Sequence, residues 1–198
     1  FELYRKGLPG ATARVKAHFG HEGAVFSEYM NASGVVFGAG WGWEGDGYRA
    51  RGKEVPFGDP RANGALGYNE LAEEGVMANQ SCAYHWESQL EHAFMMLEYH
   101  RFTGHDISAY MPFIKSSVIF FDEHYQLRQQ LRNGQTLDEN GKLVIYPSTS
   151  CESYRGATNP TDIIAGLNAC LKGLLDLDEK YLTVKEKEFY QAFQNRIP

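Results

Sequence analysis

Two long segments with helical hydrophobic spacing follow each other in the chain, separated by a turn of three residues. The first, residues 81–103, ends at Gly104, a residue type that commonly terminates helices. The second runs from about residue 107 to residue 131 and ends at Asn133–Gly134. Helices joined by so short a turn pack antiparallel. The pair therefore predicts a mainly α-helical fold built from antiparallel helix pairs.

The remaining helical patterns extend this arrangement on both sides. A helix is predicted to begin near Pro9, and two more cover residues 161–177 and 184–196. Between the helices, residues 143–146 form a short β-like run, and residues 147–160 are rich in Ser, Thr and Gly. We interpret residues 1–198 as a single partial catalytic domain.

Residues 20–79 show no helical period and accumulate glycine. An insert of this length without secondary structure is uncommon in a compact domain and is usually functional or disordered. Trp41 and Trp43 lie within it, and their indoles are suited to stacking on sugar rings, or to holding the loop on the helices. Glu28 is either a hydrogen-bonding group for substrate or a solvated side chain. We therefore interpret residues 20–79 as a long cleft loop.

Charge and motif content exclude several classes of protein. Acidic residues number 25 against 19 basic ones, and no basic run occurs, so nucleic acid is not an expected partner. The longest nearly apolar run, Val118–Phe121, is far shorter than the roughly 20 residues of a membrane helix, so no membrane partner is expected. Zinc, phosphate-loop, dinucleotide and serine-hydrolase motifs are missing, so we expect neither metal nor cofactor.

The segment 143–162 has the residue types of a carbohydrate-processing site. Glu152 follows the β-like run within a hydroxyl-rich loop, where partial burial would raise its pKa toward that of a general acid. Asp162 opens the next helix and Asn159 precedes it, so both are candidates for hydrogen bonds to sugar hydroxyls. The alternative is an ordinary loop in which Glu152 is solvated and Asp162 favours the first helical turn.

This segment resembles a known family. Pro147-Ser-Thr-Ser150 followed by Glu152 and Asp162 is similar to a signature of (α/α)6-barrel glycoside hydrolases related to family 95 fucosidases. Residues 86–104 resemble the barrel helix before that motif, and residues 14–23 resemble a neighbouring bacterial family of uncharacterised function. The resemblance implies a partial (α/α)6 barrel with a long Gly-rich loop and a short β element.

The same resemblance implies roles for individual residues. Glu152 would donate a proton to the glycosidic oxygen, and Asn159 and Asp162 would bind sugar in subsites. Trp86 is expected either in the core or at the lip of the cavity. Cys151 stands where the family commonly has Pro, so the hydrogen bonding around the acid differs here. A carbohydrate substrate and a periplasmic or secreted location follow as expectations.

An inverting hydrolase also needs a second carboxylate as general base. Twelve helices of about 20 residues each exceed the length of this chain, so we interpret it as a fragment whose base lies outside it and which is inactive alone. Glu28, Glu44 and Glu87 are the in-chain alternatives. An open part-barrel would expose an apolar face, which predicts a homodimer.

Two other functions remain open from the sequence. One is a polysaccharide lyase, in which Tyr154, Arg155 and Asn159 would abstract a proton and neutralise a uronic carboxylate. The other is a helical sugar-binding or scaffold module without turnover.

Overall fold

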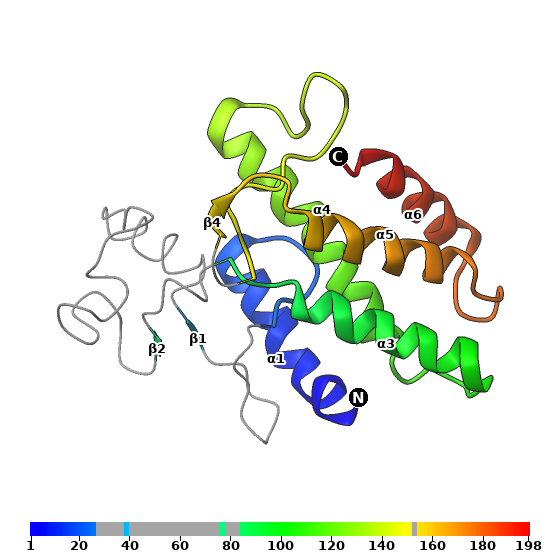
Figure 1. Cartoon of the computed structure of the whole chain (residues 1–198). Helices are drawn as coiled ribbons and strands as arrows, with labels where there is room; N and C mark the ends of the chain where they lie inside the picture. Colours follow the sequence, from blue (N-terminus) through cyan, green and yellow to red (C-terminus); the bar gives the residue numbers. More distant parts are fainter. Residues whose placement is uncertain (27–37, 40–75, 78–83, 152–153) are drawn as a thin grey trace.

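The computed structural model describes residues 1–26, 38–39, 76–77, 84–151 and 154–198 (Figure 1). This part of the chain is mainly α-helical, which confirms the predicted class. Its helices are α1 (Glu2–Phe19), α3 (Ser88–Thr103), α4 (Met111–Asn133), α5 (Thr161–Leu175) and α6 (Val184–Arg196).

Short strands accompany the helices. β1 (Gly38–Ala39) pairs in parallel with β2 (Val76–Met77), and β3 (Ser148–Ser150) pairs antiparallel with β4 (Tyr154–Ala157). The predicted β-like run at residues 143–146 is wrong, because this segment is extended chain outside any strand. Its backbone bonds to other segments: the amide of Leu143, for example, donates to the carbonyl of Arg196 at 2.7 Å.

Local sequence accounts for the helix ends. α1, α3 and α4 stop at glycines in the left-handed conformation, and each glycine amide bonds the carbonyl four residues earlier. α6 begins with a capping box in which Thr183 and Glu186 exchange hydrogen bonds. The predicted start of the first helix near Pro9 is wrong: α1 begins at Glu2 and passes through Pro9, and its Ala11 and Val15 are buried.

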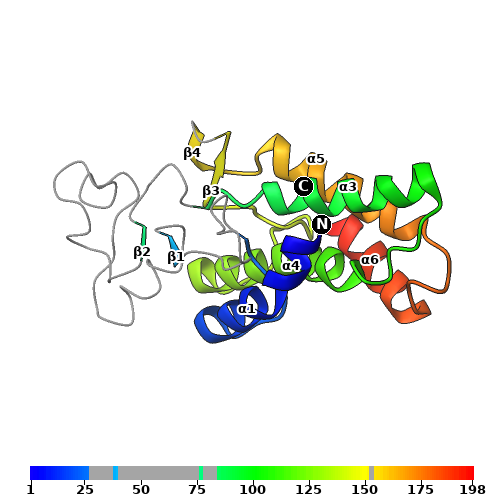
Figure 2. The same ribbon diagram turned by 90° about the horizontal axis from the view of Figure 1, so that it is seen from below.

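The helices form two layers. Figure 2 shows α3 and α5 side by side in one layer, with α1, α4 and α6 in the other. α3 and α5 are parallel, because a Cβ at Gly166 would meet Leu90 and one at Gly173, two turns on, would meet Leu97. α4 returns across α3, and α6 packs on α5. Successive antiparallel hairpins thus place alternate helices in alternate layers.

The core lies between these layers. It is rich in aromatic side chains, among them Trp86, Phe113, Phe120, Phe121, Tyr125 and Phe193. Its buried charge is paired: Asp122 accepts two hydrogen bonds from Arg196, which ties α4 to α6. The buried amide of Gln89 is satisfied by the backbone of Phe26 and Ser117.

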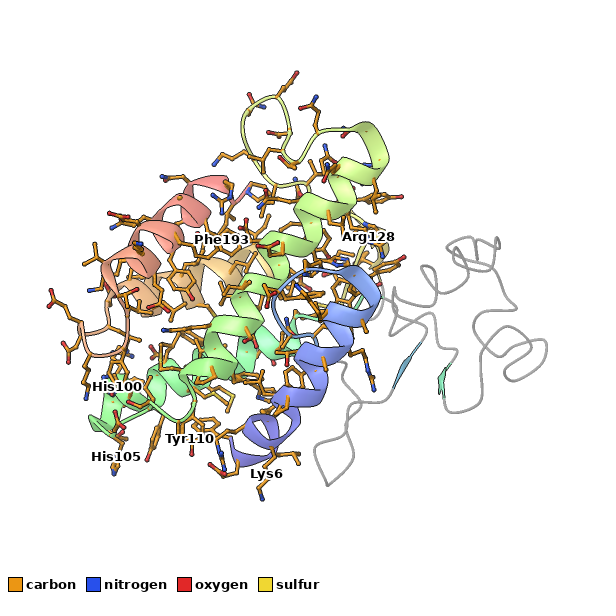
Figure 3. The ribbon with its side chains drawn as sticks, turned by 180° about the vertical axis from the view of Figure 1, so that it is seen from behind. Lys6, His100, His105, Tyr110, Arg128 and Phe193 are labelled. Carbon is orange, nitrogen blue, oxygen red and sulfur yellow. The ribbon has the colours of Figure 1, made fainter. Side chains whose placement is uncertain are left out.

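The two ends of this bundle differ. Residues 104–110 and 176–183 make short connections at one end, whereas the described parts of the longer connections, after α1 and after α4, lie at the other. Arg128 of α4 lies at this second end, beside the turn that follows α1 (Figure 3). The described residues of segment 143–162 that precede α5 lie at the end with the long connections.

One face of α3 is apolar yet exposed. Phe94, Met95 and Phe102 have 38%, 52% and 74% of their surface accessible, although the opposite side of α3 is buried against α4 and α5.

Among the helices of the described ranges, none is both long enough and apolar enough to cross a bilayer.

Candidate functional site

A β-hairpin closes the end of the bundle at which α3 and α5 begin. β3 pairs with β4 through Thr149 and Arg155, and the turn between them starts at Cys151, whose φ is 49°. The amide of Thr149 donates to the carbonyl of Tyr84 at 3.2 Å. The hairpin is thereby attached to the segment that leads into α3.

Four of the predicted site residues lie outside the described part of the chain. These are Glu152, in the hairpin turn, and Glu28, Trp41 and Trp43 in the predicted cleft loop. Glu44 belongs to the same group.

Asp162 connects the hairpin to α5. It is the second residue of the helix and is half-buried. The hydroxyl of Ser150 donates to Asp162 Oδ2 at 2.6 Å, and the amide of Ile163 donates to Oδ1 at 2.8 Å. Cys151 Sγ lies 3.9 Å from Oδ2. The carboxylate is therefore oriented by the residues immediately before Glu152, and the predicted position of Asp162 at a helix start is confirmed.

Asn159 has a structural role that the sequence reasoning did not assign. Its φ is 51°, a conformation that asparagine tolerates better than most residues. Its side-chain carbonyl accepts a hydrogen bond from the amide of Ile145 at 2.8 Å, and its own amide donates to the carbonyl of Ile145 at 3.0 Å. Asn159 thus holds the extended segment 143–146, and its Oδ1 is committed to the backbone.

Trp86 belongs to the core. Its accessible surface is 0%, and its ring packs edge-on against Phe120 and His124 at centroid distances of 5.0 and 4.9 Å. The substrate-binding role considered for Trp86 is therefore wrong, since a side chain without exposed surface offers no face to a sugar. The reason is positional: the segment before α3 lies directly over α4.

Glu87, one of the in-chain candidates for a base, is the residue immediately before α3. Its Oε1 pairs with His85 Nε2, and both side chains are largely buried. Its Oε2 is also buried and has no hydrogen-bond partner among the described residues. A buried carboxylate oxygen left in this state is costly, which makes Glu87 a candidate for a chemical role.

The sequence reasoning missed His85. The signal was a His-x-Glu sequence directly before a helix start, which is too common to stand out on its own. Tyr84 adopts a φ of 59°, and this local turn precedes the segment that brings His85 and Glu87 together.

Glu87 and Asp162 line the same open groove between α3 and α5, with a volume of about 320 Å³. Small side chains at 165, 166 and 169 form its α5 side, and Phe94 stands exposed on its α3 side. Glu91 supplies a third carboxylate, and no basic side chain lines the groove in the described chain. Hydrogen-bond acceptors beside an exposed aromatic ring suit a polyhydroxylated, uncharged ligand better than an anionic one.

No group of three His, Cys, Asp or Glu side chains within the described residues could hold a metal ion. A scan against protein-family models and searches of curated proteins and of solved structures found no match to this chain.

Proposed function

We propose that the protein is a glycoside hydrolase that acts on a glycosidic bond of an oligo- or polysaccharide, with Glu152 as the general acid. The observation that carries the proposal is the bond between Ser150 and Asp162. It ties the strand that leads to Glu152 to a carboxylate that lines a groove with Glu87 and Phe94. The bond joins two residues of the motif that carries the resemblance, and Glu87 and Phe94 of the groove lie outside that motif.

The two-layer arrangement supports a part of an (α/α)6 barrel as the finer fold. In such a barrel alternate helices form an inner and an outer layer, as α3 and α5 do relative to α4 and α6. The groove lies between α3 and α5, which would be the inner helices. We propose a carbohydrate substrate and a periplasmic or secreted location on this basis.

Inverting hydrolysis needs two carboxylates separated by roughly 6.5–9.5 Å, with a water between them. The sequence favoured a base outside the chain. Within the chain, Glu87 is the favoured alternative, because its Oε1 pairs with His85 and its side chain lines the groove that Asp162 also lines. As the base, the Glu87 carboxylate would deprotonate a water that attacks the anomeric carbon.

The groove disfavours a polysaccharide lyase. A lyase must neutralise a uronic carboxylate, whereas three carboxylates line this groove and no basic side chain within the described residues does. The binding or scaffold module shares the same ligand chemistry as the hydrolase and differs only in turnover.

The test compares the intact protein with Glu152→Gln, Glu87→Gln and Glu179→Gln, the last being an exposed carboxylate in the link before α6. Neutral oligosaccharides of defined linkage serve as probes, with reducing ends measured as product. Glu152→Gln should lower turnover by about 10²–10⁴-fold, while Glu179→Gln should match the parent. Glycosides with an activated leaving group should still be cleaved by Glu152→Gln, because their departure needs no acid.

Three results would count against parts of this proposal. Turnover unchanged in Glu152→Gln removes that residue as the acid. Binding without turnover in every variant identifies the binding module instead. An unsaturated uronate product, detected by its absorbance, identifies the lyase.

A further inference from the structure

Two histidines lie buried side by side at the end of the bundle that carries the long connections. His21 follows Gly20, the residue that ends α1, and His124 is in the second half of α4. His21 is 9% exposed and His124 is fully buried. His21 Nε2 and His124 Nδ1 are 3.3 Å apart, within hydrogen-bonding distance.

The neighbouring groups determine where the protons lie. Arg128 Nε is 3.2 Å from His124 Nε2, and a guanidinium only donates, so His124 Nε2 must accept. The proton of neutral His124 is then on Nδ1 and is donated to His21 Nε2. His21 in turn carries its proton on Nδ1, which lies 2.6 Å from the carbonyl oxygen of Glu22. Every donor therefore meets an acceptor only while both imidazoles are neutral.

The surroundings favour this neutral state. Aromatic rings of Phe19, Trp86 and Phe120 pack against His124. Burial is the main cause that lowers the pKa of His124 well below its ordinary value, and Arg128 and His21 lower it further. Burial likewise lowers the pKa of His21.

The other titratable groups near the pair still leave both imidazoles neutral. From α1, Lys16 lowers the pKa of His21, while Glu22 raises it and is itself paired with Lys16. α4 contributes Arg128 and the phenol of Tyr125, and the segment before α3 contributes Tyr84, whose ring lies under Arg128. Of these neighbours, Glu22 is the one carboxylate, and its side chain is mostly exposed.

We propose that His21 and His124 form a pH-sensitive latch, which holds residues 20–26 against α4 at neutral pH and releases them on acidification. Protonation of His124 would turn its Nε2–H toward the N–H of Arg128, so two donors would face each other. Protonated His21 would have the same conflict with His124. This inference concerns the attachment of residues 20–26 and does not depend on the proposed hydrolase activity.

Two backbone amides report on the latch directly. The amide of Ala24 donates to the carbonyl of Ser116 at 3.0 Å, and the amide of Phe26 donates to Gln89 Oε1 at 2.9 Å. Their hydrogen exchange measures how often residues 20–26 separate from α4 and α3. Released histidines would bind protons with an ordinary pKa of about 6.5, so the opening constant should rise up to tenfold per histidine for each pH unit below that value.

The experiment follows exchange of these amides from pH 7.5 to pH 5, corrected for the intrinsic pH dependence of exchange, in the parent, His21→Gln and His105→Gln. The parent should open more as pH falls. His21→Gln keeps an acceptor for His124 but cannot titrate. Its opening constant should therefore rise at most tenfold for each pH unit, because only His124 still binds a proton. His105 is exposed, so His105→Gln should behave as the parent does.

Nitrogen-15 spectra of the histidine rings provide a second test that needs no variant. Both His21 and His124 should carry their proton on Nδ1 at neutral pH, His124 should resist protonation until well below pH 6.5, and the pKa of His21 should lie below its ordinary value. An Nε2-protonated tautomer in either ring would overturn the latch. So would exchange at residues 24 and 26 that is independent of pH, or that rises only together with core amides of α5, since the latter would be global unfolding.

Discussion

At the scale of single residues, glycines show how closely the backbone segments approach. Gly23 has a φ of 102°, and a Cβ built there would lie 2.6 Å from the backbone N and Cα of Phe120. Gly10, in the middle of α1, has ordinary helical geometry and nothing within 4 Å of such a Cβ. Alanine is therefore expected to clash at position 23 and to fit at position 10.

We predict that Gly23→Ala lowers the free energy of unfolding by about 2–4 kcal/mol, because it combines a positive φ with a clash against fixed backbone. Gly10→Ala should raise the free energy of unfolding by about 0.5–1 kcal/mol, because it reduces the flexibility of the unfolded chain and improves helix propensity. Urea unfolding of the two variants measures both changes. Equal effects at the two positions would contradict the close approach of residues 20–26 to α4.

Residue-scale features also explain what the sequence could predict. The positions of Asp162 at a helix start and of the α5 and α6 helices follow from local patterns, so they were predictable. The burial of Trp86 and the bond between Asn159 and Ile145 depend on how distant segments meet. Contacts between distant segments do not change the hydrophobic periodicity of either segment, so the sequence pattern does not predict them.

At the scale of elements, α3 and α5 show that hydrophobic periodicity predicts where a helix forms better than it predicts which element the helix packs against. The buried side of α3 predicted the helix, but its exposed Phe94 and Phe102 gave no sign of which side faces a neighbour. The β-like pattern of residues 143–146 arose from burial, while the actual hairpin formed next to it from Ser, Thr and Gly. A short apolar run can therefore be buried without forming a strand.

The start of α6 offers a test at this scale. Thr183 accepts a hydrogen bond from the amide of Glu186, whose carboxylate in turn accepts from the amide of Thr183. We predict that Thr183→Ala lowers the free energy of unfolding by about 1 kcal/mol and the melting temperature by about 2–4 °C. Thr183→Ser keeps the hydroxyl and should retain most of the stability. Calorimetry of both variants decides the matter; identical losses would show that the hydroxyl contributes nothing.

At the scale of the whole molecule, the exposed apolar face of α3 is the feature without a partner in the described chain. Phe94 and Met95 are adjacent, Phe102 lies two turns after Met95, and Glu98 stands between Met95 and Phe102 in the sequence. Contiguous exposed apolar surface of this kind commonly marks an interface. The homodimer expected from the sequence remains a prediction, and this face is where it would form.

We predict that the chain self-associates through this face and that Phe102→Lys weakens the association at least tenfold, because the charge would have to be buried. Leu131→Lys, a change at an exposed apolar residue near the end of α4, should leave association unchanged. Sedimentation velocity over a range of concentrations measures the dissociation constant. A parent protein that stays monomeric at the highest concentration would rule the dimer out.

The unequal connections at the two ends of the bundle bear on how proteins of this architecture diversify. The tight links at residues 104–110 and 176–183 set the pitch of the stacked helix pairs, so changes there disturb assembly. The described residues of the connections after α1 and after α4 lie at the opposite end, where lengthening a connection adds only a small entropic cost. Segments at this end can therefore be exchanged with less disturbance of the helices than segments at the other end, and chimaeras joined at residues 134–160 would test this.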